Sequence, residues 1–207
     1  MTIRVSTLEA FRRVCEDAYG KTEDELQEYI RNGQDDQGGW QADAGTEWHH
    51  LLAGGSPGSR FTFDPATVRE AKDITGPGLK EGQVSRRVAG WPVLGHLDHW
   101  YGLTVTDHKL TFNPPDPEQY EPSLQWRFYL LLSDAKTFRY LIWHFSDKLV
   151  DAEGGMCHLK ENYGFQFHAY EGLEQDCNRW VQRFIDWADR HRLTPYLDRY
   201  PVRKSPG

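Results

Sequence analysis

The residues with the clearest capacity for chemistry lie in one short segment, at His96, Asp98 and His99. Neutral imidazole and carboxylate are common metal ligands, and histidine also exchanges protons near neutral pH. If the segment is a strand, His96 and Asp98 point to one face and His99 to the other. The spacing therefore predicts a divalent-metal site held by His96 and Asp98, with His168 as a further candidate ligand.

The His-x-Asp spacing of residues 96–98 resembles two ligands of the facial triad in iron- and 2-oxoglutarate-dependent dioxygenases. That resemblance implies a third histidine ligand downstream, for which His144, His158 and His168 are available. It also implies an arginine for the carboxylate of the cosubstrate, and Arg179 follows these histidines in the sequence.

A second possible source of ligands is the segment Glu47-Trp48-His49-His50. In a helix, Glu47 and His50 would lie one turn apart on one side. The adjacent histidines diverge in direction, so a polar helix face or loop is the simpler interpretation.

Cys157 is the cysteine that could act as a nucleophile. It follows Gly154-Gly155-Met156, where backbone amides could stabilise a thiolate, and His144 could approach as its base. A cysteine after a strand meander and before a long helix is similar to that of ubiquitin-conjugating enzymes, in which it carries the modifier. Cys15 and Cys177 fall on apolar helix stripes and are expected to be buried.

Two features could form a binding surface. Residues 54–60 are rich in glycine and end at Arg60, so backbone amides there could bind a phosphate, although the P-loop spacing and lysine are missing. Trp48, Trp91 and Trp100 lie near predicted loops, and tryptophan is enriched at binding hot spots. These rings could equally belong to the core.

Composition limits the class of protein. The 207 residues suit one domain, and 8 Trp, 10 Tyr and 10 Phe must supply much of its core. A net charge of −7 disfavours general nucleic-acid binding. Three cysteines without C-x-x-C spacing favour a reducing, cytoplasmic compartment. The sequence contains no run of about 18 apolar residues, so we expect no membrane span.

The elements that must position these residues begin with two helices. Ser6 and Glu9 form a capping-box pattern before one helix, and Thr22 and Glu25 form another before a helix that ends near Gly33. Residues 34–92 are expected to be mainly loop, apart from a helix over 65–73 that starts with Pro65.

The centre of the chain is strand-like. Strands are predicted over 93–101, 103–106 and 109–112, with a turn at Asp107-His108. Alternating apolar residues predict a central hairpin of 124–132 with 138–145, a further strand over 163–170 and a long amphipathic helix from Leu173.

Together these patterns predict an α+β fold in a single domain, 1–207. An aromatic-rich antiparallel sheet of about five or six strands spans 93–170. A helical segment at 1–33 and a loop-rich region at 34–92 precede it; a helix at 171–192 packs on it, and a basic tail follows at 193–207.

Three functions remain open. An acidic amino-terminal region, a basic tail and the lack of a complete catalytic motif favour an accessory protein that binds a protein partner, such as an immunity protein, inhibitor or complex subunit. The alternative is a metal-dependent hydrolase or oxygenase with its site at His96 and Asp98. A third possibility is thiol chemistry at Cys157.

Overall fold

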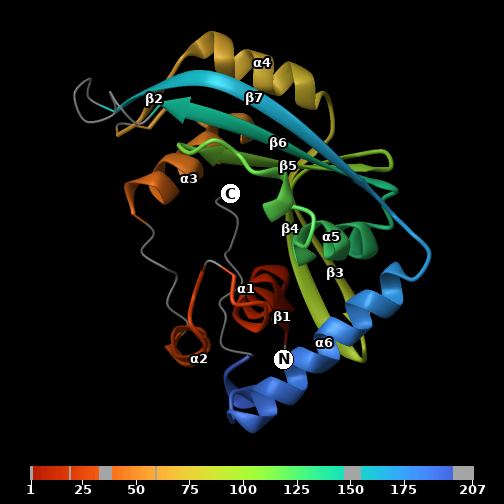
Figure 1. Cartoon of the computed structure of the whole chain (residues 1–207). Coiled ribbons are helices and arrows are strands. Elements are labelled where there is room, and N and C mark those ends of the chain that lie inside the picture. The colour runs from red at the N-terminus through yellow and green to blue at the C-terminus, as the bar shows by residue number, and fades with distance from the viewer. Residues whose placement is uncertain (1, 19, 33–38, 59, 147–154, 198–207) are drawn as a thin grey trace.

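A computed structural model describes residues 2–18, 20–32, 39–58, 60–146 and 155–197. The described residues confirm an α+β fold (Figure 1). The helices are α1 Val5–Cys15, α2 Glu23–Asn32, α3 Trp40–Ala53, α4 Pro65–Thr75, α5 Leu124–Ser133 and α6 Leu173–Arg190. The strands are β1 Ile3–Arg4, β2 Thr62–Phe63, β3 Leu79–Val88, β4 Trp91–Tyr101, β5 Thr104–Thr111, β6 Thr137–Ser146 and β7 Met156–His168. Two 3-10 turns, Pro117–Gln119 and Thr194–Tyr196, complete the described elements.

The seven strands form one mixed sheet rather than an antiparallel one. Its order is β1-β4-β5-β6-β7-β2, with β3 on the other side of β4. The β3–β4, β4–β5 and β6–β7 pairs are antiparallel, whereas β5 and β6 are parallel. A parallel pair needs a crossover connection, and α5 supplies it.

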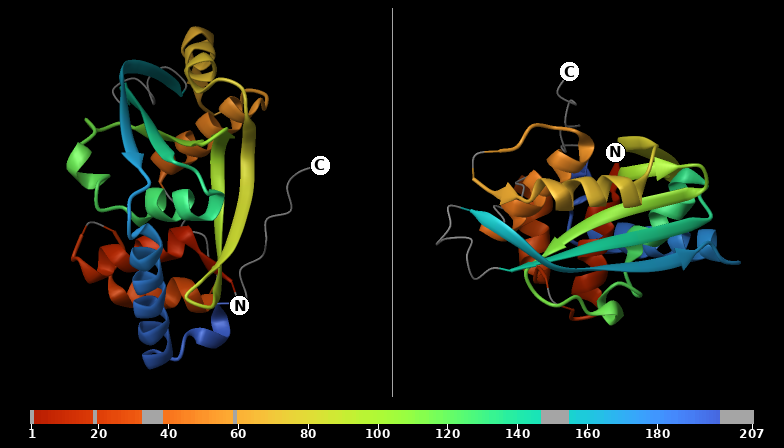
Figure 2. Two further views of the ribbon diagram at one scale, coloured as in Figure 1. Left: turned by 90° about the vertical axis from the view of Figure 1, so that its right-hand side faces the viewer. Right: turned by 90° about the horizontal axis from the view of Figure 1, so that it is seen from above.

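Two hydrophobic clusters lie on the sheet. The large cluster joins α1, α2, α5 and α6 to the sheet and includes Leu8, Leu26, Phe128, Phe138, Ile142 and Phe184. The small cluster joins α3, α4 and β2 to the far ends of β6 and β7; it consists of Ala44, Trp48, Leu51, Leu52, Phe61, Phe63, Ala71, Phe112, Trp143, Phe145 and Cys157. Figure 2 shows that α4 and α6 lie at opposite ends of the molecule, with the long strands running between them.

The segment 124–132, predicted as a strand, is helix α5. Ser123 caps it, since its Oγ accepts the N–H of Gln125 at 3.1 Å. Apolar residues cover nearly all sides of this helix, because it lies between other helices and the sheet. A helix buried all round has no polar face to reveal its 3.6-residue period, so the apparent alternation was misleading.

The predicted turn at Asp107-His108 is also wrong. β5 runs without a break through both residues and pairs with Tyr140 and Leu141 of β6. The chain turns earlier, at Gly102, where φ is +57°. Glycine adopts this left-handed backbone without the steric cost that a side chain brings.

Other expectations for the helices have mixed outcomes. The Thr22–Glu25 capping box is confirmed, with Thr22 N–H 2.8 Å from the Glu25 carboxylate, and so is the helix that begins at Pro65. The Ser6–Glu9 capping box does not form, because α1 begins at Val5, so Arg4 and not Ser6 is the N-cap, and Glu9 accepts the N–H of Leu124 instead. Gly33 and the tail beyond 197 lie outside the described residues.

The region 34–92, expected to be loop-rich, contains α3, α4 and β3 among its described residues. The long helix after residue 170 is confirmed as α6, which packs through Val181, Phe184 and Ile185. None of the described helices is long and apolar enough to cross a membrane.

Candidate metal centre

The site begins at a gap in the sheet beside β4. Along one edge of β4, Val93 and Leu94 pair with β1, and residues 99–101 pair with β5. Between these contacts β4 and β5 separate, and α5 approaches the opening. A Cβ at Gly95 would lie 2.8 Å from the Tyr129 ring, so glycine permits this close approach. The separation gives side chains from both strands room to meet.

Asp98 lies in this gap. Its Oδ2 accepts the N–H of His108 at 2.7 Å and lies 3.3 Å from Nδ1 of His49 on α3. Burial would raise the pKa of Asp98, but His49, Lys109 and the His108 N–H outweigh burial and lower that pKa. Asp98 is therefore an ionised acceptor at neutral pH. The same contact raises the pKa of His49 against the effect of its own burial.

Glu81 brings a second carboxylate to Asp98. It lies between the pairs Lys80–His99 and Gly82–Leu97 of the β3–β4 ladder, and its φ of +52° breaks the regular strand there. Ligand atoms of His49, Glu81 and Asp98 all lie within 4.8 Å of one another. Burial and the charge of Asp98 raise the pKa of Glu81, so the two carboxylates repel each other. One imidazole nitrogen and two carboxylate oxygens that repel each other suit a divalent cation.

Asp107 and Lys109 adjoin this triad on β5. Lys109 Nζ lies 2.7 Å from Asp107 Oδ2, and Nε2 of Gln125 on α5 donates to Asp107 Oδ1 at 2.7 Å. Burial and nearby Asp98 raise the pKa of Asp107 to about 6. Burial opposes the charge on Lys109, but Asp107 and Asp98 raise its pKa, so the ammonium stays protonated.

His108 points to the other face of β5 and ties the strand to α4. Trp143 Nε1 donates to His108 Nδ1 at 3.2 Å, so the ring proton is on Nε2, 2.9 Å from Thr75 Oγ1. Thr75 in turn donates to the carbonyl of Ala71. Burial lowers the pKa of His108 to about 4, which keeps the ring neutral and this chain of hydrogen bonds intact.

A pocket between α3, α4 and the sheet opens onto the triad. Its lining combines His49, Glu81 and Asp98 with the cationic side chains of Lys72 and Lys80. Lys80 is held by a 3.1 Å hydrogen bond from Nζ to the carbonyl of Leu52. Acidic and basic groups therefore share one pocket, which suits an anionic substrate bound beside a cation.

Of the predicted metal ligands, the structure places Asp98 in this cluster. His96 is exposed and faces Gln83 across the ladder. His168 is at the end of β7 opposite Thr137, with β5 and β6 between it and β4. Arg179, which the dioxygenase resemblance assigns to a cosubstrate, pairs with Asp176 on α6.

The two residues predicted for thiol chemistry have different neighbours. Cys157 is buried in β7 opposite Phe63, and burial raises its pKa to about 11, which disfavours a thiolate. His144 is buried in β6, with Nδ1 3.3 Å from Glu161.

The predicted binding residues do not form one surface. Trp48 is fully buried in the small cluster, while Trp91 and Trp100 are partly buried against the large cluster. Arg60 is exposed and forms an ion pair with Asp43.

Glu81, Asp107 and Lys109 were not predicted as site residues, and His49 was not selected within the segment 47–50. One signal was available, because an Asp-x-Lys pair within a strand places both side chains on the same face. The assumed turn at Asp107-His108 concealed it.

No protein-family model matches the sequence, and no curated protein does either. The fold is similar to solved structures of other proteins. An alkaline exonuclease, LHK-Exo from Laribacter hongkongensis, has a TM-score of 0.54 and 12% identity, over 92% of this chain and 89% of that chain. A phage related exonuclease from Haemophilus somnus has a TM-score of 0.55 and 13% identity, over 93% of this chain and 96% of that chain. At such identities the likeness shows a shared fold.

These likenesses contradict two predictions from the sequence. One is the accessory protein that binds a protein partner and lacks a catalytic centre; the other is that general nucleic-acid binding is disfavoured. The fold is that of proteins described as exonucleases. The net charge of −7 is an average over the chain, whereas lysines line the pocket itself.

Proposed function

We propose that this protein is a metal-dependent nuclease that hydrolyses phosphodiester bonds in nucleic acid. The observation that carries the proposal is the His49–Glu81–Asp98 triad, whose ligand atoms lie within 4.8 Å of one another beside the Asp107–Lys109 pair. The shared fold with two exonucleases supports the same class of reaction.

His49, Glu81 and Asp98 would hold the cation, and Asp107 adds a carboxylate at the edge of the cluster. A divalent metal at this position supplies Lewis-acid polarisation of a phosphoryl oxygen and a more acidic bound water. Asp98 contributes a ligand that is ionised at neutral pH, because its neighbours lower its pKa.

Lys109 is placed to stabilise negative charge. Its pKa is raised, so the ammonium stays protonated and can face the charge that develops on a phosphate during attack by water. In the hydrolysis one P–O ester bond breaks, the water oxygen joins phosphorus and the leaving oxygen takes a proton. Lys72 and Lys80 in the pocket wall can bind neighbouring phosphates of the same nucleic-acid strand.

A hydrolase fits the structure better than an oxygenase. The His-x-Asp pair of the dioxygenase resemblance is split, since Asp98 lies in the triad and His96 is exposed on its strand. The sheet is mixed and open, with helices on it. It brings Asp98 beside two further candidate metal ligands, His49 on α3 and Glu81 on β3.

A reducing, cytosolic location is part of the proposal. Cys15, Cys157 and Cys177 are all free thiols. Free thiols persist where the compartment is reducing.

The test is degradation of end-labelled linear DNA, single-stranded and double-stranded, by the purified protein with Mg²⁺ or Mn²⁺ and with a chelator. We expect cleavage only with metal, and a loss of about a thousandfold or more in Asp98→Asn, because removal of one charged ligand disrupts the centre. His96→Asn is the matched control, since His96 lies on the same strand but is exposed. Equal rates for Asp98→Asn and the wild type would refute the proposal.

A further inference from the structure

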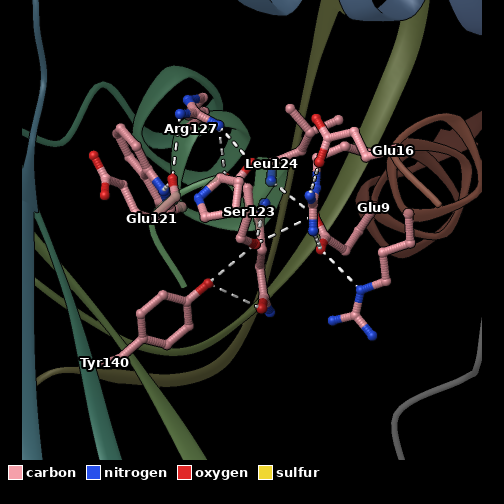
Figure 3. Close-up of polar contacts among 12 residues, drawn as sticks. Glu9, Glu16, Glu121, Ser123, Leu124, Arg127 and Tyr140 are labelled. Carbon is pink, nitrogen blue, oxygen red and sulfur yellow. Dashed lines mark hydrogen bonds and ion pairs between the residues drawn. The ribbon is translucent and has the colours of Figure 1, made fainter. Parts of the chain in front are cut away.

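Glu9 on α1 is a largely buried carboxylate whose hydrogen bonds cap a different helix (Figure 3). Its Oε2 accepts the N–H of Leu124, the first residue of α5, at 2.7 Å. The same oxygen accepts from Ser123 Oγ at 3.2 Å. Glu9 therefore bonds the N-terminus of α5 across more than half the chain, although its spacing from Ser6 suggested a local capping box.

Arginines on α1 fix the Glu9 carboxylate. Arg12 Nη2 lies 2.7 Å from Glu9 Oε1, and Arg13 Nε lies 3.1 Å from the same oxygen. The Glu9 side chain is 12% exposed and that of Arg12 is 4% exposed. Burial would raise the pKa of Glu9, but Arg12, Arg13 and the Leu124 N–H lower it. The carboxylate is thus a charged, rigid acceptor at neutral pH.

The first turn of α5 continues from Glu9 to the candidate centre. Gln125 follows Leu124, and its Nε2 donates to Asp107 at 2.7 Å. Tyr140 OH, on β6, lies 3.4 Å from both Ser123 Oγ and Gln125 Oε1, so the cap and the Gln125 amide share a neighbour. Figure 3 shows this sequence of contacts from α1, across the start of α5, to Tyr140.

We propose that Glu9 is a positioning residue: by fixing the first turn of α5, it aims the Gln125 amide at Asp107 and so sets the carboxylate's place beside the metal triad. The inference rests on the proposed nuclease function for its catalytic consequence, but the placement of Gln125 is a separate physical claim. Without Glu9 the N–H of Leu124 loses its acceptor, and the start of α5 can shift. A displacement of about 1 Å in a positioned group can cost about a hundredfold in rate.

The series of hydrogen bonds from Glu9 to Gln125 can be distinguished from a role of Glu9 in the stability of α1 alone. Glu16 offers a matched comparison, because it also forms an ion pair with Arg12 on α1, and among the described residues none of its hydrogen bonds or ion pairs reaches α5. If Glu9 only stabilised α1, its loss and the loss of Glu16 would have similar consequences. If Glu9 positions α5, the Gln125 side-chain amide must move when Glu9 is lost and stay in place when Glu16 is lost.

The experiment compares Glu9→Ala, Glu9→Gln and Glu16→Ala as folded, full-length proteins. One measurement is the ¹⁵N–¹H NMR signal of the Gln125 side-chain amide, assigned with a Gln125→Glu variant. The other is steady-state hydrolysis of the DNA substrate with Mg²⁺, separated into kcat and KM.

We expect the Gln125 signal to move in Glu9→Ala and kcat to fall about tenfold or more, with KM within about twofold. Glu9→Gln keeps an acceptor for the Leu124 N–H and should recover most of kcat. Glu16→Ala should leave both readouts near the wild type. An unmoved Gln125 signal in Glu9→Ala, or equal effects of Glu9→Ala and Glu16→Ala, would overturn the inference. If the wild-type protein shows no hydrolysis, the proposed function fails instead, and the NMR measurement alone decides the placement claim.

Discussion

The two hydrophobic clusters support the candidate centre in different ways. The large cluster reaches it through buried polar contacts, since α5 holds Asp107 by the amide of Gln125. The small cluster reaches it through packed rings, because Trp48 directly precedes His49 in α3. The centroid of the Trp48 ring lies 5.2 to 5.5 Å from the ring centroids of Phe63, Trp143 and Phe145. The centre therefore lies where two separately stabilised regions meet. We therefore expect that one cluster can be perturbed while the other remains folded.

The largest effect is expected from Trp48→Ala, which removes a ring at the centre of the small cluster. Trp48 is fully buried, so its loss should lower the free energy of unfolding by about 3–5 kcal/mol. His49 should lose its place beside Asp98, while α5 and α6 remain packed. Hydrogen exchange should show faster exchange in α3 and α4 than in α6. Uniform loss of protection across both clusters would mean that they unfold as one unit.

Asp107→Asn tests the polar half through pH. The folded-state pKa of Asp107, about 6, exceeds its ordinary 3.8. Between these values the folded protein keeps a proton that the unfolded chain releases, so the free energy of unfolding falls as pH rises and then levels off above the folded pKa. Asparagine does not ionise, so the variant lacks this fall in the free energy of unfolding.

Without metal, Asp107→Asn should therefore match the wild type at about pH 4 and be more stable by about 1–3 kcal/mol at about pH 8. Denaturant unfolding in a chelator measures both values. A variant less stable than the wild type at the higher pH would show that the Lys109 pair outweighs burial.

The smallest effect is expected from loss of His49, the candidate metal ligand on α3. His49→Ala should weaken Mn²⁺ binding about tenfold, which corresponds to about 1.4 kcal/mol, with the fold intact. His50→Ala is the control, because it is exposed on the same helix. Calorimetric titration gives both affinities. Equal affinities for the two variants would remove His49 from the ligand set and leave the metal to the carboxylates.

Local signals predicted part of the fold. The Thr22–Glu25 box, Pro65 after Asp64 and the apolar stripe of α6 all involve neighbouring residues, so the sequence alone specified them. Helix α5 could not be predicted this way. Its burial on nearly every side depends on α1, α6 and the sheet, which are distant in the sequence.

Of the candidate centre, the sequence patterns led to Asp98 alone, although the Asp-x-Lys spacing of Asp107 and Lys109 was also present. His49, Glu81 and Asp107 come from α3, β3 and β5, and their proximity depends on how β4 and β5 separate. Glu9 illustrates the same limit from another side. Its spacing from Ser6 matched a local pattern, but burial against α5 gave its carboxylate a stronger, long-range set of donors.

The irregular backbone at Glu81 has a consequence for association between molecules. β3 is an edge strand among the described residues, since it pairs only with β4. An exposed regular edge is a template on which the strand of another molecule can add. The left-handed residue at 81, next to Gly82 and flanked by Lys80, interrupts that template and places charge along it. The distortion that turns a carboxylate toward the pocket thus also protects the sheet against edge-to-edge aggregation.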